Sequence, residues 1–416
     1  MKAIILSVGD ELVLGQTVDT NSAWVSAQLA AVGCDIAAHA TVPDDQPAIE
    51  AAIRAAASAC DVLIISGGLG PTADDLTRQA LAGVLNQPLE LDKIWLGKLE
   101  EFFRQRNRPM APTNRIQAMI PRGAKMIDNS AGTAPGIEAT LQSCHIFSIP
   151  GVPKEMKLMF QQSILPSIAQ TAGGAVILSR TLHTFGVGES SIAQILGDLM
   201  DRKRNPSVGT SVFGGLVSLR LNSRFPNRET AQQKLDETDN HCRRVLGDLI
   251  YGQDDQSLAQ AVSKLLVESR ATVSTAESCT GGLLAKMLTD IPGSSRYFQR
   301  GWITYSNQSK TDLLGVPPDL IAKQGAVSEP VASAMASGAR ARSEASAAMA
   351  ISGVAGPEGG TPEKPVGTVC IALATQETVI VRTFNFAGDR EMIRDRSAKM
   401  ALTLLRYSLL GKRAPF

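Results

Sequence analysis

Aromatic residues and net charge are both scarce in this 416-residue sequence. Phe, Trp and Tyr together make up 4% of the residues, and the formal net charge is +1. The composition therefore supplies few rings for stacking on bases and no overall attraction for polyanions. The one dense basic run, "MDRKRNP" at 200–206, is interpreted as a solvated loop. We expect neither nucleic acid nor a membrane as a direct partner.

Closely spaced cysteines and long apolar runs are missing as well. The six cysteines form no CxxC, which argues against a zinc knuckle and a disulfide framework and fits a reducing cytosol. The N-terminal apolar run is broken by Gly9, Asp10 and Glu11 before the core of a signal peptide could form. No apolar run approaches the length of about 18 residues that spans a bilayer. We expect a cytoplasmic protein.

What the sequence does contain is glycine, 36 residues of it, among short β-rich runs that alternate with helical ones. Strands are predicted at 3–9, 35–42 and 61–68, with helices at 21–31 and 46–59 between them. This alternation predicts right-handed βαβ crossovers and therefore an α/β fold with a parallel sheet. In such a sheet the functional loops follow the carboxyl ends of the strands.

The chain is long enough for more than one domain. "TAGG" at 171–174 and "YGQDDQS" at 251–257 are turn-rich boundary candidates. We predict a parallel-sheet domain over 1–170, a small α+β module over 171–252 and a second α/β domain over 253–416. In the last domain we predict strands at 271–277, 300–306 and 347–353, a long helix near 328–344, a hairpin over 366–386 and a closing helix from Asp389.

The stretch "AESCTGG" at 276–282 places two nucleophiles, Ser278 and Cys279, at a predicted junction of strand and helix. Backbone N–H groups at such a junction can bind a phosphate or an oxyanion. The alternative is a tight turn in which the glycines serve only the backbone and the cysteine is a small buried side chain. The candidate anion-binding residues are Cys279, Thr280, Gly281 and Gly282.

Histidine is absent from the predicted last domain. All four histidines, His39, His145, His183 and His241, precede residue 250. A nucleophile there needs another base, and a partly desolvated lysine can lose its proton near neutral pH, often with help from a tyrosine. "TYSNQSK" at 304–310 supplies Tyr305 and Lys310 after the next predicted strand. Lone Tyr and Lys residues are usually surface residues, and local sequence leaves that alternative open.

The loop "SGVAGPEGGTPEKPVGT" at 352–368 holds five glycines after an apolar strand. Close approach of the backbone to a ligand is one reason for so many. Arg390, with Arg394 one turn further along the last predicted helix, can bind a phosphate or can be an exposed charge. The candidate ligand contacts in this part of the chain are Ser352, Gly353, Gly356 and Arg390.

Five stretches in this order, "AESCTGG", "TYSNQSK", "GAVSEP", "ISGVAGPEGGTPEKPVGTV" and "AGDREMIR", resemble the C-terminal domain of the CinA (competence-damage-inducible) family over about 255–410. The resemblance implies a nicotinamide-nucleotide amidase that hydrolyses nicotinamide mononucleotide (NMN) to nicotinic acid mononucleotide and ammonia, with no metal required. The family's catalytic serine, tyrosine and lysine fall on Ser278, Tyr305 and Lys310. The neutral amine of Lys310 would then take the serine proton, directly or through Tyr305.

The stretch "SGGLGPTADDLT" at 66–77 follows another predicted buried strand. Its glycine N–H groups can approach a phosphate or pyrophosphate, and adjacent carboxylates can hold a divalent cation that bridges it. The alternative is a helix-capping aspartate after a tight turn. "GDELVLGQTVDTN" at 9–21 adds Asp10, Glu11 and Asp19 on a neighbouring loop. The candidate nucleotide contacts are Gly67, Gly68, Gly70, Thr72 and Asp10, and the candidate metal ligands are Asp74 and Asp75.

Together with "PGVPKEM" at 150–156, these stretches resemble the MoaB/MogA-like molybdopterin-binding fold that begins CinA proteins. The resemblance implies a metal-dependent ADP-ribose pyrophosphatase, although relatives of the fold bind molybdopterin and the domain alone leaves pterin binding open. The middle module of CinA proteins resembles a KH fold, but this sequence lacks the GxxG loop by which KH domains hold nucleotides. We interpret the module as a spacer or dimerisation element and expect a homodimer.

Two kinds of function compete for this sequence. The first is an enzyme of pyridine-nucleotide recycling that acts on NMN and ADP-ribose. The alternative is a non-catalytic nucleotide- or pterin-binding module in competence or DNA-damage responses. The intact set of Ser278, Tyr305 and Lys310 favours the enzyme.

Overall fold

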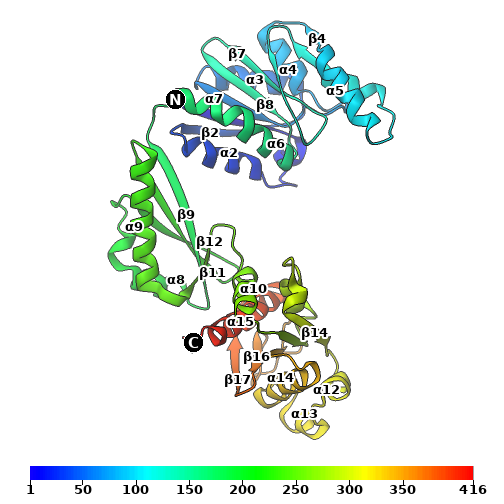
Figure 1. Ribbon diagram of the computed structural model, residues 1–416, viewed down its shortest axis with the longest axis vertical. Helices are drawn as coiled ribbons and strands as arrows, with labels where there is room; N and C mark the ends of the chain where they lie inside the picture. The colour runs from blue at the N-terminus through cyan, green and yellow to red at the C-terminus, as the bar shows by residue number, and fades with distance from the viewer. Residues whose placement is uncertain (416) are drawn as a thin grey trace. The chain divides into compact units, whose positions relative to one another are not determined.

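The computed structural model describes residues 1–415 and contains three sheets of four or more strands, each accompanied by helices (Figure 1). The predicted α/β class is confirmed. The chain divides into two compact units, one formed by residues 1–179 and 222–236 and one formed by the rest. Within residues 1–415, none of the helices combines the length and the apolar character needed to cross a membrane.

The first sheet has the strand order β2-β1-β3-β8-β7-β6. Neighbours β2, β1, β3 and β8 run parallel, whereas β7 and β6 return antiparallel. The parallel pairing predicted for the first three strands is confirmed, and their carboxyl ends meet at one edge of the sheet. The strands are β1 (Lys2–Val8), β2 (Asp35–Val42), β3 (Val62–Ser66), β6 (Lys125–Ile127), β7 (Gly136–Leu141) and β8 (Cys144–Ile149).

Helices cover both faces of this sheet. Leu63 and Ile65 of β3 pack with residues of α3 and α4, whereas Ile64 between them packs with residues of α2 and α6. Side chains alternate along a strand, so a strand that is buried on both faces is a continuous apolar run. A separate pair, β4 (Leu89–Leu91) and β5 (Met119–Pro121), lies outside the sheet. The helices are α1 (Asp10–Val13), α2 (Thr20–Ala30), α3 (Gln46–Ala57), α4 (Thr77–Leu85), α5 (Lys93–Arg104), α6 (Pro153–Met159) and α7 (Leu165–Thr171).

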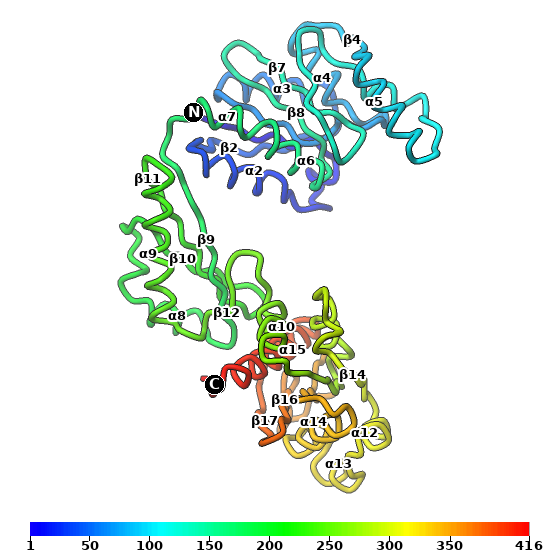
Figure 2. The backbone as a smooth tube through the Cα atoms, in the orientation of Figure 1, coloured from blue at the N-terminus to red at the C-terminus, as the bar shows by residue number. Residues whose placement is uncertain are grey.

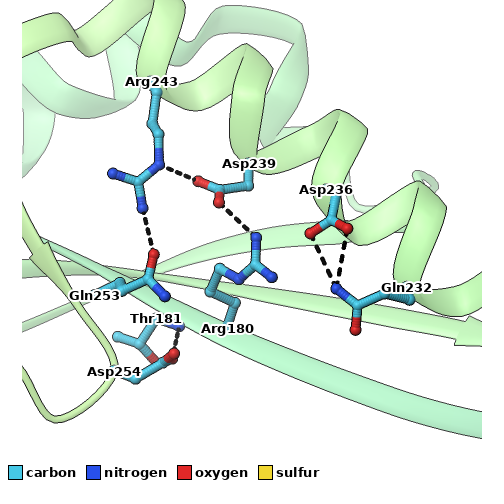
Figure 3. Close-up of polar contacts among 8 residues, drawn as sticks. All are labelled: Arg180, Thr181, Gln232, Asp236, Asp239, Arg243, Gln253 and Asp254. Atoms are coloured by element: carbon cyan, nitrogen blue, oxygen red, sulfur yellow. Dashed lines mark hydrogen bonds and ion pairs between the residues drawn. The ribbon is translucent and has the colours of Figure 1, made fainter.

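The middle sheet has the order β10-β11-β9-β12, and a buried carboxylate holds a long helix on it. Asp239 on α9 is 6% exposed and accepts hydrogen bonds from Arg180 Nη1 (2.5 Å) and Arg243 Nε (2.7 Å), as Figure 3 shows. Arg243 Nη2 also donates to Gln253 on β12 at 2.7 Å. The elements are β9 (Val176–Phe185), α8 (Glu189–Leu196), β10 (Ser207–Phe213), β11 (Leu216–Phe225), α9 (Arg228–Leu246) and β12 (Ile250–Gln253).

The last sheet has the order β14-β13-β15-β16-β17. Strands β14, β13 and β15 run parallel. Strand β16 is antiparallel to β15 and forms the predicted antiparallel hairpin with β17. Glu277 at the end of β13 pairs with Ile303 and Ile351, so the residues that follow these three strands begin at one edge of the sheet. The strands are β13 (Val273–Glu277), β14 (Phe298–Ile303), β15 (Ala347–Gly353), β16 (Thr368–Ala374) and β17 (Val379–Asn385).

Two helical layers enclose this sheet (Figure 2). Met349 and Ile351 of β15 pack with residues of α10, α11 and α15, whereas Ala348 and Ala350 pack with residues of α12, α13 and α14. The alanines leave room for α14 to lie close to the sheet. The helices are α10 (Leu258–Glu268), α11 (Leu283–Thr289), α12 (Asn307–Leu314), α13 (Pro318–Gln324), α14 (Glu329–Ser343) and α15 (Arg390–Leu409).

Gly338 provides a test of the close packing between α14 and α12. A Cβ at Gly338 would lie 1.9 Å from the carbonyl oxygen of Leu314, the last residue of α12. Gly-to-Ala substitution inside a helix usually stabilises by about 1 kcal/mol, whereas overpacking costs about 1–3 kcal/mol. We expect Gly338→Ala to lower the thermal unfolding midpoint, measured by calorimetry on the full chain.

The matched control is Gly97 in α5, where an added Cβ would have no atom within 4 Å. Gly97→Ala should therefore raise the midpoint of its own domain slightly, following helix propensity alone. A midpoint that rises equally in both variants would contradict the close contact between α12 and α14.

Candidate active site

Ser278 lies directly after β13, at the carboxyl edge of the last sheet. Its N–H donates to the Ile351 carbonyl at 2.9 Å, which continues the pairing with β15, and the residue is 9% exposed. The chain then turns sharply through Gly281 (φ +60°) and Gly282 (φ +94°) into α11. A residue with a Cβ would be strained at such positive φ values, so the backbone conformation of the turn accounts for glycine at both positions.

Lys310 lies opposite this serine on the first half of α12. Ser306 caps the helix by accepting from the Ser309 N–H at 3.0 Å. The Lys310 side chain is 1% exposed, and its Nζ lies 3.2 Å from Ser278 Oγ and 2.9 Å from the Thr304 carbonyl oxygen. The sheet and the helix therefore bring together two residues that are 32 positions apart in the sequence.

The surroundings of Lys310 favour the neutral amine over the ammonium form. Burial lowers the pKa of Lys310 below its ordinary value near 10.5. Its hydrogen-bond partners are the hydroxyl of Ser278 and the main-chain carbonyls of residues 304–306, all of them uncharged. An ammonium group buried without a carboxylate is costly, so the proton is lost more easily. The free amine can accept a proton from the serine hydroxyl.

Cys279 has the opposite properties. It is 6% exposed, and burial raises the pKa of its thiol to about 11. The thiolate is the nucleophilic form of cysteine, and almost none is present near neutral pH at such a pKa. Of the two neighbouring nucleophiles, the serine is therefore the one with a base.

Tyr305 is not hydrogen-bonded to this pair through its hydroxyl in the described structure. Its side chain is 61% exposed, and its hydroxyl accepts from Arg390 Nη2 at 3.1 Å. Arg390 Nη1 donates to the Gly356 carbonyl at 2.7 Å, so the arginine joins Tyr305 to the glycine-rich loop. The structure thus brings Ser278 and Lys310 together directly and places Tyr305 beside Arg390.

The N–H groups of the turn are only partly available for an anion. The Gly282 N–H donates to the Glu277 carboxylate at 3.0 Å, and the Gly281 N–H donates to the Ser278 carbonyl at 3.1 Å. Two of the candidate anion-binding N–H groups, those of Gly281 and Gly282, are therefore already engaged by the turn itself and by the adjacent acidic side chain. Among residues 1–415, the N–H groups of Cys279 and Thr280 have no such acceptor.

The glycine-rich loop after β15 borders the same edge. Ser352 is 1% exposed, and its hydroxyl donates to the Ala326 carbonyl at 2.7 Å, so it supports the loop. A Cβ at Gly353 would lie 2.7 Å from a Val369 methyl carbon, and Gly356 has a φ of +76°. Packing within the loop therefore accounts for these two glycines. Arg394 also faces inward, where its Nη2 donates to the Thr280 carbonyl at 2.7 Å.

The first domain contains an open cleft of about 520 Å³ at the carboxyl ends of β1, β3 and β8. Three loops approach one another here with little side-chain bulk. A Cβ at Gly67 (φ +110°) would lie 2.3 Å from the Val8 carbonyl oxygen, and one at Gly151 would lie 3.5 Å from the Gly67 Cα. Gly68 and Gly70 line the cleft as well, as the sequence predicts for ligand-binding glycines.

Asp75 stabilises the loop that carries these glycines. Its carboxylate accepts from the N–H groups of Gly70 (2.8 Å) and Thr72 (2.9 Å) and from the Thr72 hydroxyl. Asp74 lies beside it on the cleft wall. The carboxylate of Asp75 thus holds the loop together and does not cap α4, which has no side-chain cap. Both aspartates line the cleft.

Asp44 is a cleft residue that the sequence analysis did not identify. Its carboxylate accepts from the Asp10 N–H at 3.0 Å, and its own N–H donates to Asp10 at 3.2 Å. Burial raises the pKa of Asp44, and the nearby carboxylates of Asp10, Glu11 and Asp74 raise it further. The signal for it lay in "VPDDQP", directly after the second strand.

Asp19 has a structural role at the same cleft. It caps α2 by accepting from the Ser22 N–H at 2.9 Å, and the hydroxyls of Ser22 and Ser7 each donate to it at 2.6 Å. Burial raises the pKa of Asp19, but these hydrogen bonds outweigh burial and leave it below its ordinary value. Within residues 1–415, no three His, Cys, Asp or Glu side chains form a ready-made metal site. A cation here would therefore take further ligands from substrate phosphate and water, as Mg²⁺ commonly does.

Fold and site together define a multidomain α/β protein with a buried serine–lysine pair in its last domain. Three known domain families match successive parts of the chain. The CinA C-terminal domain matches residues 255–409, the damage-inducible protein CinA KH domain matches residues 179–252, and a domain described as "Probable molybdopterin binding domain" matches residues 4–170. The chain belongs to the CinA family.

Two relatives of similar length, both curated proteins, support this membership. A Symbiobacterium thermophilum protein named for competence-damage induction is 44% identical, with 99% of each chain covered. A CinA-like protein of Geotalea daltonii is 40% identical, covering 99% of this chain and 100% of that one. The crystal structure of competence/damage inducible protein CihA from Agrobacterium tumefaciens is 42% identical, covering 37% of this chain and 93% of that one, with a TM-score of 0.36.

Proposed function

We propose that the C-terminal domain is an amidohydrolase that converts NMN to nicotinic acid mononucleotide and ammonia. The observation that carries the proposal is the buried Lys310 amine, 3.2 Å from Ser278 Oγ and surrounded by neutral partners. A serine with a neutral amine as its base is suited to acyl transfer. Membership of the CinA family, with the motifs for this activity intact, supports NMN as the substrate.

The reaction follows from the positions of these groups. Lys310 accepts the Ser278 proton as Oγ attacks the amide carbon, and N–H groups of the turn stabilise the oxyanion. The C–N bond breaks, and the lysine ammonium returns the proton to the departing nitrogen, which leaves as ammonia. Water then attacks the acyl-enzyme and gives its proton to Lys310, which restores the serine hydroxyl as the acid is released.

Tyr305 links Arg390 to this pair, since its carbonyl accepts from Lys310 Nζ and its hydroxyl accepts from Arg390. The Arg390 guanidinium donates to the Tyr305 hydroxyl and to the Gly356 carbonyl. Arg390 is exposed, so its positive charge remains accessible to a ligand. Such a group suits the phosphate of a mononucleotide. In this arrangement Tyr305 acts on substrate binding through Arg390, and proton transfer passes directly between Ser278 and Lys310.

The first test is ammonia release from NMN by the purified full chain. Ser278→Ala and Lys310→Arg should each lose activity by about 10³-fold or more, because one removes the nucleophile and the other replaces the base with a permanent cation. Cys279→Ala is the matched control and should stay within about threefold of wild type, since its thiol is protonated. Loss of activity in Cys279→Ala alone would reverse the choice of nucleophile, and no release by wild type would refute the amidase.

The pH dependence provides a separate prediction. The neutral form of Lys310 is the active form, and burial lowers its pKa. Activity should therefore rise with pH as the solution passes through that lowered pKa and then level off below the ordinary lysine value of about 10.4. The measurement is kcat/KM for NMN between about pH 6 and pH 10. A rate that falls across this range would contradict the neutral amine.

We propose a second activity for the first domain, the metal-dependent hydrolysis of ADP-ribose to AMP and ribose 5-phosphate. The supporting observation is that Asp44, Asp74 and Glu11 line one cleft, where a divalent cation would reduce the repulsion between their carboxylates. When bound, such a cation would neutralise pyrophosphate charge and polarise its phosphorus centres. Asp44 and Asp74 would hold it together with water and substrate phosphate, while the loop of Gly67 to Gly70 would lie against the phosphates.

The test is AMP formation from ADP-ribose with Mg²⁺ or Mn²⁺ and with chelator. Asp44→Asn should lower the metal-dependent rate at least about tenfold, because it removes one anionic ligand. Asp35→Asn, at the exposed amino end of β2, is the control and should match wild type. Full activity in Asp44→Asn would remove this residue from the site. Absence of turnover with bound ADP-ribose or pterin would instead favour the non-catalytic binding module.

A further inference from the structure

Glu277 is a buried acidic residue that the proposed chemistry leaves without a role. It precedes Ser278, is 1% exposed and forms no ion pair among the described residues. Three backbone N–H groups instead compensate its carboxylate. Oε2 accepts from Gly282 and Leu284, both at 3.0 Å, and Oε1 accepts from Ala285 at 2.8 Å. A carboxylate buried in this way needs all of these donors.

These hydrogen bonds join the residue before the nucleophile to the helix after it. The turn between them is held from the other side by Arg394, which donates to the Thr280 carbonyl at 2.7 Å. Glu277 also acts through its main chain, because its carbonyl accepts from the Thr304 N–H at 2.7 Å. The Thr304 carbonyl in turn accepts from Lys310 Nζ at 2.9 Å. One residue is therefore connected to both the nucleophile and its base.

The same carboxylate accepts from the backbone N–H groups at the amino end of α11. Donation by the Gly282, Leu284 and Ala285 N–H groups leaves those of Cys279 and Thr280 as the turn's uncommitted donors within residues 1–415. Two adjacent N–H groups beside the nucleophile are what an oxyanion requires.

We propose that Glu277 is a positioning residue that holds the turn from 278 to 282 so that the N–H groups of Cys279 and Thr280 receive the oxyanion at Ser278. The inference rests on the proposed amidase reaction. Glu277 does not touch the substrate. Its effect is on a developing negative charge, so its loss changes kcat far more than KM.

The test variant is Glu277→Gln, which has the same shape but replaces one acceptor oxygen with an NH₂ group facing N–H donors. We expect kcat for NMN to fall about tenfold to hundredfold, with KM changed less than about threefold. Glu268→Gln is the matched control, since that glutamate is 57% exposed on α10 and pairs only with Lys264. Arg394→Met, which releases the Thr280 carbonyl, should lower kcat in the same manner.

Labelling of Ser278 by a fluorophosphonate probe, followed by mass spectrometry, separates this inference from the proposed function. If wild type hydrolyses NMN and Glu277→Gln keeps the wild-type kcat, the positioning role is overturned and the amidase stands. If wild type does not hydrolyse NMN, the amidase fails, and the positioning role is then decided by labelling. Slower labelling in Glu277→Gln than in Glu268→Gln supports the role, whereas equal labelling, or no labelling of wild type, overturns it.

The folding of the Glu277→Gln variant is checked by circular dichroism. If this variant does not fold, the Arg394→Met variant tests the inference instead. Arg394 does not contact the buried carboxylate and donates to the turn at the Thr280 carbonyl, and the methionine removes this hydrogen bond. A lowered kcat, or a slower labelling rate, with an unchanged KM supports a turn that must be held for the oxyanion. An Arg394→Met variant as fast as wild type overturns the inference.

Discussion

The candidate active site depends on a single buried amine without a counter-ion. Lys310 is almost completely enclosed, and within residues 1–415 its Nζ hydrogen-bonds to a hydroxyl and to main-chain carbonyls. The desolvation that would destabilise an ammonium group is the same effect that makes the neutral amine available as a base. The parallel strands that position Ser278 and the helix that presents Lys310 must both be in place for this effect to act on the serine.

The two candidate sites use acidic residues in a similar way, although they are built on different sheets. In each, a carboxylate next to a glycine turn accepts backbone N–H groups of that turn. Asp75 does so for Gly70 and Thr72, and Glu277 does so for Gly282 and the start of α11. Such a turn is held by charge-assisted hydrogen bonds, which are stronger than neutral ones. An acidic residue in a glycine motif can therefore organise the site without contacting the ligand.

Long apolar elements were predictable from the sequence, and short polar ones were not. The strand at 35–42 and the helix near 328–344 correspond to β2 and α14, because both have a regular pattern over many residues. The helix α12 is short, polar and lacks such a pattern, yet it carries Lys310. Its place next to β13 follows from the crossover that leads from β14 back over the sheet, a constraint that no local window contains.

The sequence by itself determined the α/β class, the family motifs and the candidate pair of Ser278 and Lys310, because residue identity and the missing histidines carry that information. Tertiary structure decided the environment of each side chain. It buried the Cys279 thiol, directed the Tyr305 hydroxyl to Arg390 and brought Asp44 beside Asp10. Burial and hydrogen bonding determine the pKa of a side chain and the groups that it can contact. Burial and hydrogen bonding both depend on neighbours that are distant in the chain.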